Sequence, residues 1–369
     1  MADFPFLDLK RVYAAHKDAY ESAALKCLEG GWYVLGEEVK KFETSFASHH
    51  QAAGAAGVAN GTDALVLALK AAGLKPGDAV ITVSHTAIAT IAAIRWAGYT
   101  PILVDIDRET FTMAPESVEE ALHTFGASHS IKALLPVHLY GHPAPMTELL
   151  AIGEKHGLTV IEDCSQAHLA SHNQRRVGSM GRYGCFSLYP TKNLGAFGDA
   201  GVITAAAESD LKTLQMLREY GWSKRYVSEL EGYNSRLDEL QAALLNIRIE
   251  HLQADTDRRR EIACRYDGAL MKSKLQEPRV GADAYHVYHQ YTVLSSDRDA
   301  TRKALDDRGI PTGILYPAAA HTQAPYLDIP KVSLERTDWV LKHLFQLPIY
   351  PQITDDEVAR VVDALYEVG

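Results

Sequence analysis

Between residues 56 and 204 the chain alternates short apolar runs with stretches whose apolar residues have helical spacing. Continuous apolar runs of this length are typical of strands buried on both faces, and alternation with helices such as residues 62–72 indicates a mostly parallel sheet covered by helices. The pattern therefore predicts a large α/β domain. The runs lie at residues 56–59, 79–83, 101–104, 133–137, 158–161, 184–188 and 201–204.

Beyond residue 204 the pattern changes to longer helical stretches. Residues 208–220 and 235–266 are expected to be helices, and the second is long enough to cross from one domain towards another. Residues 288–294, residues 313–316 and a last helix from Thr354 fit a smaller α+β unit. We therefore expect a large domain with the N-terminal segment over residues 1–255 and a small C-terminal domain over residues 256–369.

Composition narrows the kind of partner. The 369 residues include 37 Lys and Arg against 47 Asp and Glu, a net charge of −10, which disfavours a nucleic-acid or anionic-membrane surface but allows a local basic pocket. The N-terminus lacks the basic and apolar regions of a signal peptide, so we expect a cytoplasmic protein. The four cysteines form no C-x-x-C pair, which argues against a disulfide framework or a zinc site.

Lys192 has unusual surroundings for a lysine. It lies between a short apolar run, residues 185–189, and the glycine-rich residues 195–201. A lysine that condenses with an aldehyde needs a dry, fixed loop that lowers its pKa from about 10.4 towards neutrality. A solvated loop lysine is the commoner case, so its neighbours must decide.

The segment at residues 60–65 follows the first apolar run. Gly61 permits a tight turn, and Thr62 and Asp63 open a helix whose free N–H groups and dipole could hold a phosphate. An ordinary helix cap explains the same residues equally well.

Two further strand ends carry polar residues. Asp163 follows the run at residues 158–161, where a buried carboxylate needs a cationic partner such as a protonated pyridine nitrogen, although a helix cap is an alternative. Ser187 shares a loop with Lys192, and the two suit a phosphate oxygen and an aldehyde carbon. Ligands collect at strand ends in such sheets, and these parts together are what pyridoxal phosphate requires.

Six segments resemble the DegT/StrS-type nucleotide-sugar aminotransferases, a branch of the fold-type I pyridoxal-phosphate enzymes. The resemblance runs almost end to end and implies the fold-type I architecture, transaminase activity and pyridoxal 5'-phosphate as the cofactor. The segments are residues 32–36, 60–65, 162–168, 187–195, 232–241 and 347–351.

The resemblance also implies roles for residues at matching positions. Lys192 would form the Schiff base with the cofactor, Asp163 would pair with its ring nitrogen, and Asn234 would reach the phosphate of the neighbouring subunit. The implied assembly is a homodimer with shared active sites. The other cofactor-binding residues implied are Gly61, Thr62, Asp63, Gln166 and Ser187.

One segment departs from the family pattern. Many relatives place an aromatic residue over the cofactor ring, but residues 84–90 of this chain have Ala87 at that position. Either His85 or another residue covers the ring, or this face of the ring is more open than usual.

Residues 215–226 resemble the sub-branch that aminates C3 of dTDP-linked 3-keto-6-deoxyhexoses, in deoxyamino-sugar biosynthesis. By family habit the amino donor is L-glutamate, which leaves as 2-oxoglutarate. Arg and Lys suit a diphosphate and Tyr suits a sugar or base, although surface packing explains each candidate equally well. The substrate candidates are Tyr33, Tyr220, Trp222, Lys224, Arg225, Tyr316 and His321.

Several alternatives stay open. An aminotransferase acting at C4 of a UDP- or GDP-linked keto-sugar shares most of these motifs, and a non-catalytic regulator or sensor on the same fold is a different class. Eliminations and dehydrations also occur on this scaffold, but the dehydratase relatives lack the lysine. His138, His142 and His168 lack the i, i+4 spacing of a helical metal pair, so we expect no metal.

Overall fold

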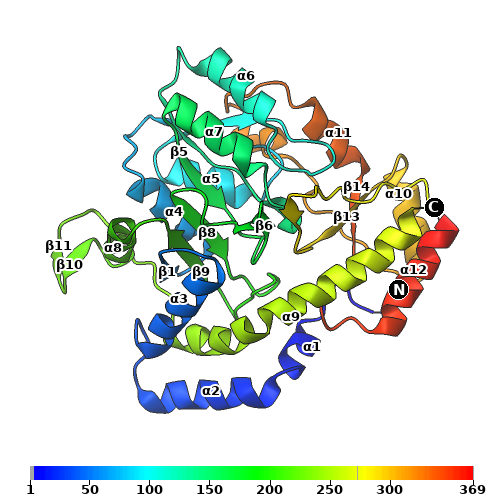
Figure 1. Ribbon diagram of the computed structural model, residues 1–369, viewed down its shortest axis with the longest axis horizontal. Helices are drawn as coiled ribbons and strands as arrows, with labels where there is room; N and C mark the ends of the chain where they lie inside the picture. The colour runs from blue at the N-terminus through cyan, green and yellow to red at the C-terminus, as the bar shows by residue number, and fades with distance from the viewer. Residues whose placement is uncertain (1–3, 272, 369) are drawn as a thin grey trace.

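A computed structural model describes residues 4–271 and 273–368, and a seven-stranded sheet lies at its centre (Figure 1). The strand order is β1-β9-β8-β5-β4-β2-β3, and β9 alone runs antiparallel to both of its neighbours. The seven expected apolar runs correspond to these strands, which confirms the α/β prediction. Their bounds are β1 Gly54–Val58, β2 Ala79–Val83, β3 Thr100–Val104, β4 Ile131–Leu134, β5 Thr159–Asp163, β8 Tyr183–Ser187 and β9 Gly201–Ala205.

Helices connect these strands and cover the sheet, and α4 packs against β8 and β9. The helix expected at residues 208–220 ends at Leu217, because Tyr220 has a φ of 58° and Gly221 a φ of 75°, and this left-handed backbone turns the chain out of the helix. The helices of this part are α1 Leu9–Ala14, α2 Lys17–Gly30, α3 Glu37–His49, α4 Gly61–Ala71, α5 Ile88–Trp96, α6 Pro115–Phe125, α7 Met146–His156 and α8 Glu208–Leu217.

A small hairpin follows α8 and projects from the molecule (Figure 1). Its strands, β10 Trp222–Lys224 and β11 Val227–Ser228, pair antiparallel. The sequence pattern gave no indication of this hairpin, because its strands are two and three residues long and half-buried or exposed.

The long helix α9, Glu239–Leu270, runs from the sheet towards the C-terminal helices (Figure 1). Its first half, including Leu245 and Leu252, belongs to the core of the sheet, whereas Ile262 and Tyr266 belong to a second apolar core. Phe4 also packs in that second core, so a division at residue 255 separates the two cores along α9 but not at the N-terminus.

The C-terminal part is built around two paired strands. Residues 313–316 form no strand of their own, since only Gly313 pairs with Gln346 and the side chain of Gln346 accepts from the N–H of Leu315. The elements of this part are β12 Ala284–Tyr285, which joins β6 Ser171–His172 and β7 Arg175–Arg176 in a small sheet, β13 Tyr291–Leu294, which pairs with β14 Leu344–Leu347, and the helices α10 Arg298–Asp306, α11 Glu335–His343 and α12 Asp355–Val368.

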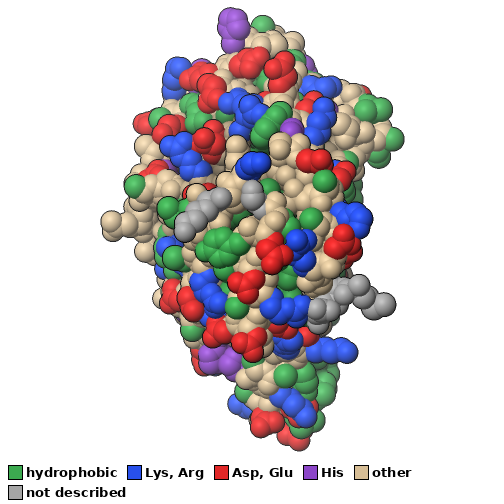
Figure 2. Space-filling model, turned by 90° about the vertical axis from the view of Figure 1, so that its right-hand side faces the viewer, with side chains coloured by type: hydrophobic (Ala, Val, Ile, Leu, Met, Phe, Trp, Pro, Cys, Tyr) green, Lys and Arg blue, Asp and Glu red, His purple; other side chains and the backbone are tan. Residues whose placement is uncertain are grey.

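Acidic and basic side chains are interspersed on the face that Figure 2 shows, which fits the moderate net charge of −10. Among residues 4–271 and 273–368, none of the helices has both the length and the apolar character that a membrane crossing requires.

Candidate active site

A cavity of about 530 Å³ lies where β5 and β8 end and α4 begins. Ligands of open α/β sheets bind at such strand ends. The cavity brings together seven of the nine candidates for cofactor binding and one substrate candidate, although they are up to 255 positions apart, from Gly61 to Tyr316. Those residues are Gly61, Thr62, Asp63, Asp163, Gln166, Ser187, Lys192 and Tyr316.

The start of α4 forms one end of the cavity. Asn60, not Thr62 or Asp63, caps the helix, because its side chain accepts from the N–H of Asp63 at 2.8 Å. The carbonyl of Asn60 accepts a hydrogen bond from the N–H of Ala64. Within the described chain, the N–H groups of Gly61 and Thr62 are then the free donors of the first turn. Free N–H groups at the positive end of a helix dipole suit an anion such as a phosphate.

Gly61 is required by the close approach of β8. A Cβ atom at this position would lie 2.6 Å from the Cβ and 2.9 Å from the Cα of Ser187. The absence of a side chain therefore lets the hydroxyl of Ser187 and the N–H groups of α4 face the same space.

Asp163 lies at the end of β5, and its carboxylate is held on both oxygens. Oδ1 accepts from the N–H of Ser165 at 3.1 Å, and Oδ2 accepts from the hydroxyl of Thr90 at 2.8 Å. Because the hydroxyl of Thr90 donates its proton to Asp163, the hydroxyl of Thr86 must donate to that of Thr90, and the two oxygens are 2.9 Å apart. The carboxylate is thus fixed in orientation, and the charge suits a cationic partner in the cavity.

Lys192 faces Asp163 from the loop after β8. Burial lowers its pKa to about 8, and the negative charge of Asp163 offsets part of that effect. Helix α9 holds the far side of the loop, since Arg248 donates to the carbonyl of Gly195 and Gln241 accepts from the N–H of Phe197. A fixed lysine with a pKa near neutrality is suited to nucleophilic attack and to proton transfer.

Gln166 lies between two tyrosines. Its Oε1 accepts from the backbone N–H of Tyr140 at 2.7 Å, and its Nε2 donates to the hydroxyl of Tyr316 at 2.9 Å. Burial raises the pKa of Tyr316 to about 12, with the charge of Asp163 acting in the same direction, so the phenol stays protonated and keeps a proton to donate.

His85 does not line the cavity. Its Nε2 lies 2.8 Å from the hydroxyl of Tyr140, which itself donates to the carbonyl of Leu315, so Nε2 carries the proton of a neutral ring. Burial lowers the pKa of His85 to about 4. Ala87, two positions on, does line the cavity, so a methyl group forms this part of its wall.

Asn234 is exposed and is not among the residues that line the cavity, although its neighbour Ser235 donates to Asp63 at 2.7 Å. His321 contacts Ser84 at 2.8 Å, and Tyr33 is exposed between α2 and α3. The remaining substrate candidates lie on or beside the hairpin. The ring centroids of Trp222 and Tyr220 are 5.3 Å apart, and Lys224 and Arg225 are exposed.

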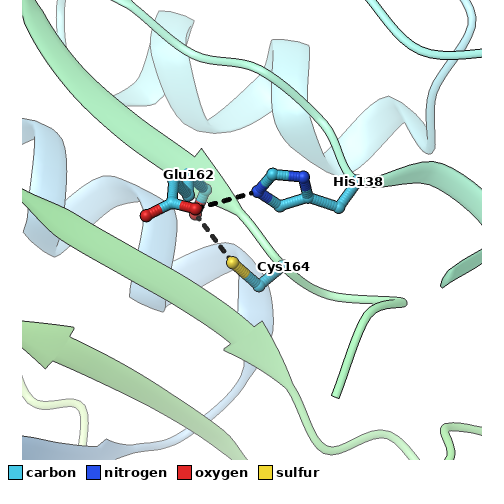
Figure 3. Close-up of side chains that lie close together, drawn as sticks. All are labelled: His138, Glu162 and Cys164. Carbon is cyan, nitrogen blue, oxygen red and sulfur yellow. Dashed lines mark hydrogen bonds and ion pairs between the residues drawn. The ribbon is translucent and has the colours of Figure 1, made fainter. Parts of the chain in front are cut away.

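The three histidines considered for a metal do not share a site. His142 packs beside His286, and His168 packs among aromatic rings. His138 lies with Glu162 and Cys164 (Figure 3), but its Nδ1 accepts from the N–H of Ala144 and its Nε2 contacts Glu162 at 3.0 Å.

Hydrogen bonds account for the cluster in Figure 3. The carboxylate of Glu162 also accepts from the N–H groups of Gly178, Met180 and Gly181, at 2.7 to 2.9 Å. These bonds fix the last turn before β8 to the end of β5, next to Asp163.

Two residues that hold cavity side chains in place, Thr90 and Tyr140, have no predicted role in the sequence analysis. Thr90 lies in the segment at residues 84–90 that departs from the family pattern, and the signal for it in the sequence is a second threonine, Thr86, four positions earlier. Tyr140 contributes its backbone N–H to Gln166, and no side-chain pattern marks such a contact.

The residues of the cavity fit pyridoxal phosphate. The beginning of α4 with Ser187 offers an anion site that a Cβ at residue 61 would fill, Asp163 offers an oriented carboxylate, and Lys192 offers an amine of lowered pKa. When bound, this cofactor supplies an aldehyde carbon and a ring that accepts electrons.

Comparison with known proteins points the same way. Residues 15–366 match the sequence profile of the DegT/DnrJ/EryC1/StrS aminotransferase family. A dTDP-3-amino-3,4,6-trideoxy-alpha-D-glucose transaminase of Streptomyces venezuelae is 40% identical over 98% of this chain and 95% of its own length. A UDP-N-acetyl-3-dehydro-alpha-D-glucosamine 3-aminotransferase of Acidithiobacillus ferrooxidans is 39% identical over 98% of this chain and 96% of its own.

The crystal structure of S. venezuelae DesV in complex with a ketimine intermediate superposes with a TM-score of 0.95 at 40% identity. The match covers 100% of this chain and 98% of that chain.

Proposed function

Since the chain belongs to the DegT/DnrJ/EryC1/StrS aminotransferase family and is a pyridoxal-phosphate-dependent aminotransferase, we propose that it moves an amino group from L-glutamate to a nucleotide-linked keto-deoxysugar. The convergence of Lys192, Asp163 and the start of α4 on one cavity is the observation that carries this proposal. The proposed sugar is a dTDP-3-keto-6-deoxyhexose.

The chain's own residues divide the work. Lys192, with a pKa of about 8, is partly neutral near neutral pH, so it can take a proton from the substrate carbon and return it. Asp163, held by Thr90 and Ser165, would pair with the ring nitrogen of the cofactor, and its carboxylate would stabilise a proton there. We assign the ring hydroxyl to Gln166 and the phosphate to Gly61, Thr62 and Ser187.

The position of amination is supported by the relatives. The transaminase from S. venezuelae and the aminotransferase from A. ferrooxidans both carry a C3 amino product or C3 keto substrate in their names, with dTDP in one and UDP in the other. These names favour C3 over the C4-aminating alternative.

The substrate test uses purified protein with cofactor, L-glutamate and a panel of 3-keto and 4-keto sugars linked to dTDP, UDP or GDP. We expect amination of the dTDP-linked 3-keto sugar and release of 2-oxoglutarate. Amination of a 4-keto sugar alone would overturn the assignment to C3.

We further propose a homodimer in which Asn234 of one subunit serves the cofactor phosphate of the other. The exposure of Asn234 and its absence from the lining of its own cavity support this arrangement.

We propose a division into units at about residue 255, which the two cores along α9 support. We also propose a cytoplasmic location, which the four unpaired cysteines support.

Subunit mixing tests the shared site. Lys192→Ala and Asn234→Ala subunits are mixed at a cofactor concentration at which neither variant alone is active. A heterodimer then has one intact site, so random mixing restores about a quarter of the wild-type activity. If Asn234 served its own subunit, mixing would restore nothing.

A further inference from the structure

The segment from His286 to Gln290 lies directly against the loops that form the cavity. The N–H of Val287 donates to the carbonyl of Gly141 at 3.0 Å, and the N–H of Gln290 donates to the carbonyl of Tyr140 at 3.1 Å. Gly141 has a φ of 96°, and a Cβ there would lie 2.9 Å from the backbone nitrogen of His289. The segment is therefore in close backbone contact with Tyr140, whose own N–H donates to the side chain of Gln166.

The same segment binds the lysine loop through Asn193. The Nδ2 of Asn193 donates to the carbonyl of Val287 at 3.1 Å, and Nδ1 of His289 lies 3.2 Å from the Oδ1 of Asn193. A carbonyl can only accept, so the amide orientation is fixed and Nδ1 of His289 must carry the proton. Asn193 is 4% and His289 5% exposed, so water does not compete for either bond.

The segment is itself held by the C-terminal part of the chain. It leads into β13, and the buried guanidinium of Arg259 donates to the carbonyls of Tyr288 and Ile349, at 3.1 and 2.8 Å. Arg260 donates to the carbonyl of His286 at 2.8 Å. The loop that carries Lys192 is thus bonded to a segment that Arg259 and Arg260 hold in place.

We propose that the contacts of Asn193 with Val287 and His289 form a positioning clamp, by which the segment at residues 286–290 keeps Lys192 at a fixed depth in the cavity. Asn193 and His289 are positioning residues that act through Lys192. The inference rests on the proposed function, because it concerns the placement of the residue that carries the chemistry there.

The clamp has a measurable consequence for Lys192. The lysine faces a cavity but is surrounded by protein, and that burial holds its pKa at about 8 against an ordinary value of 10.5. A loop released from the segment lets the amine reach water, and its pKa then rises. Asp163 is the charged group that acts on the pKa of Lys192, and it remains in place in the variants below. His168 and His289 also face Lys192, and burial lowers the pKa of both well below the ordinary value, so neither carries a charge near pH 8.

The test labels the cofactor-free protein with acetic anhydride over a pH series and measures acetylation of Lys192 by peptide mass spectrometry. We expect half-maximal labelling near pH 8 in the wild type. Asn193→Ala and His289→Ala should raise this midpoint by at least about one pH unit. In the loaded enzyme, kcat should fall about tenfold or more with KM for the donor little changed, because a misplaced reacting group slows chemistry more than binding.

Two matched variants separate positioning from general destabilisation. His289→Asn keeps an N–H donor close to the position of Nδ1 and should restore the wild-type midpoint. Asn246→Ala removes a buried side chain that, like Asn193, makes two hydrogen bonds, here both donated to Glu38, and should lower thermal stability without moving the midpoint.

The clamp is overturned if Asn193→Ala and His289→Ala fold, by circular dichroism, and keep the wild-type midpoint. Should Asn193→Ala fail to fold, His289→Ala alone decides, because it leaves the bond between Asn193 and Val287 intact. Borohydride trapping of pyridoxal phosphate on wild-type Lys192 is measured in parallel. Absence of that trapped lysine would contradict the proposed function, whereas the labelling midpoints would still report on the clamp.

Discussion

The wall of the cavity and the hairpin at residues 222–228 hold their polar side chains in opposite ways. In the cavity, Asp163 and Gln166 each have two hydrogen-bond partners within the chain. On the hairpin, Lys224 and Arg225 are exposed, and Arg225 lies over the ring of Tyr226, itself 72% exposed. The groups proposed for proton transfer and ring binding are thus held in place by the chain itself, whereas the groups proposed for the nucleotide are exposed to solvent on the hairpin.

Lys192→Ala gives the largest expected effect, since it removes the central group of the preorganised region. Transamination should fall by at least about a thousandfold, because both nucleophile and proton carrier are lost. Circular dichroism should show an unchanged fold. Turnover is measured by release of 2-oxoglutarate, and a variant with normal turnover and a borohydride-reducible cofactor linkage would show that another residue carries the chemistry.

The region around Lys192 and Asp163 could be predicted from the sequence, because the apolar pattern shows where each strand ends. Lys192 and Asp163 follow buried runs, and carboxyl ends of parallel strands meet at one edge of a sheet. The hydrogen bonds that orient Asp163 and the lysine loop could not be predicted from this pattern. The contact from Thr90 to Asp163 spans 73 positions, and that from Asn193 to Val287 spans 94.

His85 shows a different limit of the sequence. A resemblance can place a residue on a segment, but the direction of its side chain depends on partners far along the chain, here Tyr140. The hairpin shows a third limit, since its short, half-buried or exposed strands lack the alternation that marks longer strands.

A double change on the hairpin, Lys224→Ala with Arg225→Ala, tests the other side of the comparison. If these side chains bind the diphosphate of the sugar substrate, KM for the nucleotide sugar should rise about thirtyfold, because two charge-assisted contacts are lost. The half-reaction with L-glutamate should be unchanged. Steady-state kinetics with each substrate varied in turn measures both, and an equal loss in the two half-reactions would contradict a role confined to the nucleotide.

Thr90→Val tests how much the orientation of Asp163 contributes. Valine keeps the shape of threonine but removes the hydroxyl that donates to Oδ2 of Asp163 at 2.8 Å. We expect kcat to fall about tenfold, since a hydrogen bond to a charged group contributes in that range. Thr90→Ser retains the hydroxyl and should stay close to the wild type. If Thr90→Val and Thr90→Ser were equally active, the bond would have no catalytic part.

The smallest expected effect is on stability and concerns the charge of Lys192 in the cofactor-free protein. Its pKa is about 8 in the folded chain against an ordinary 10.5, so between these pH values the unfolded chain binds a proton that the folded chain does not. Stability therefore rises with pH across this window relative to Lys192→Met, and below pH 8 the buried ammonium destabilises the wild type. Allowing for water in the cavity, we expect a difference of about 1 kcal/mol in urea unfolding. Lys224→Met, on the exposed hairpin, buries no charge and should not show this pH dependence. A Lys192→Met protein that tracked the wild type from pH 7 to 10.5 would mean that the cavity does not desolvate its lysine, and the contrast between the two regions would be lost.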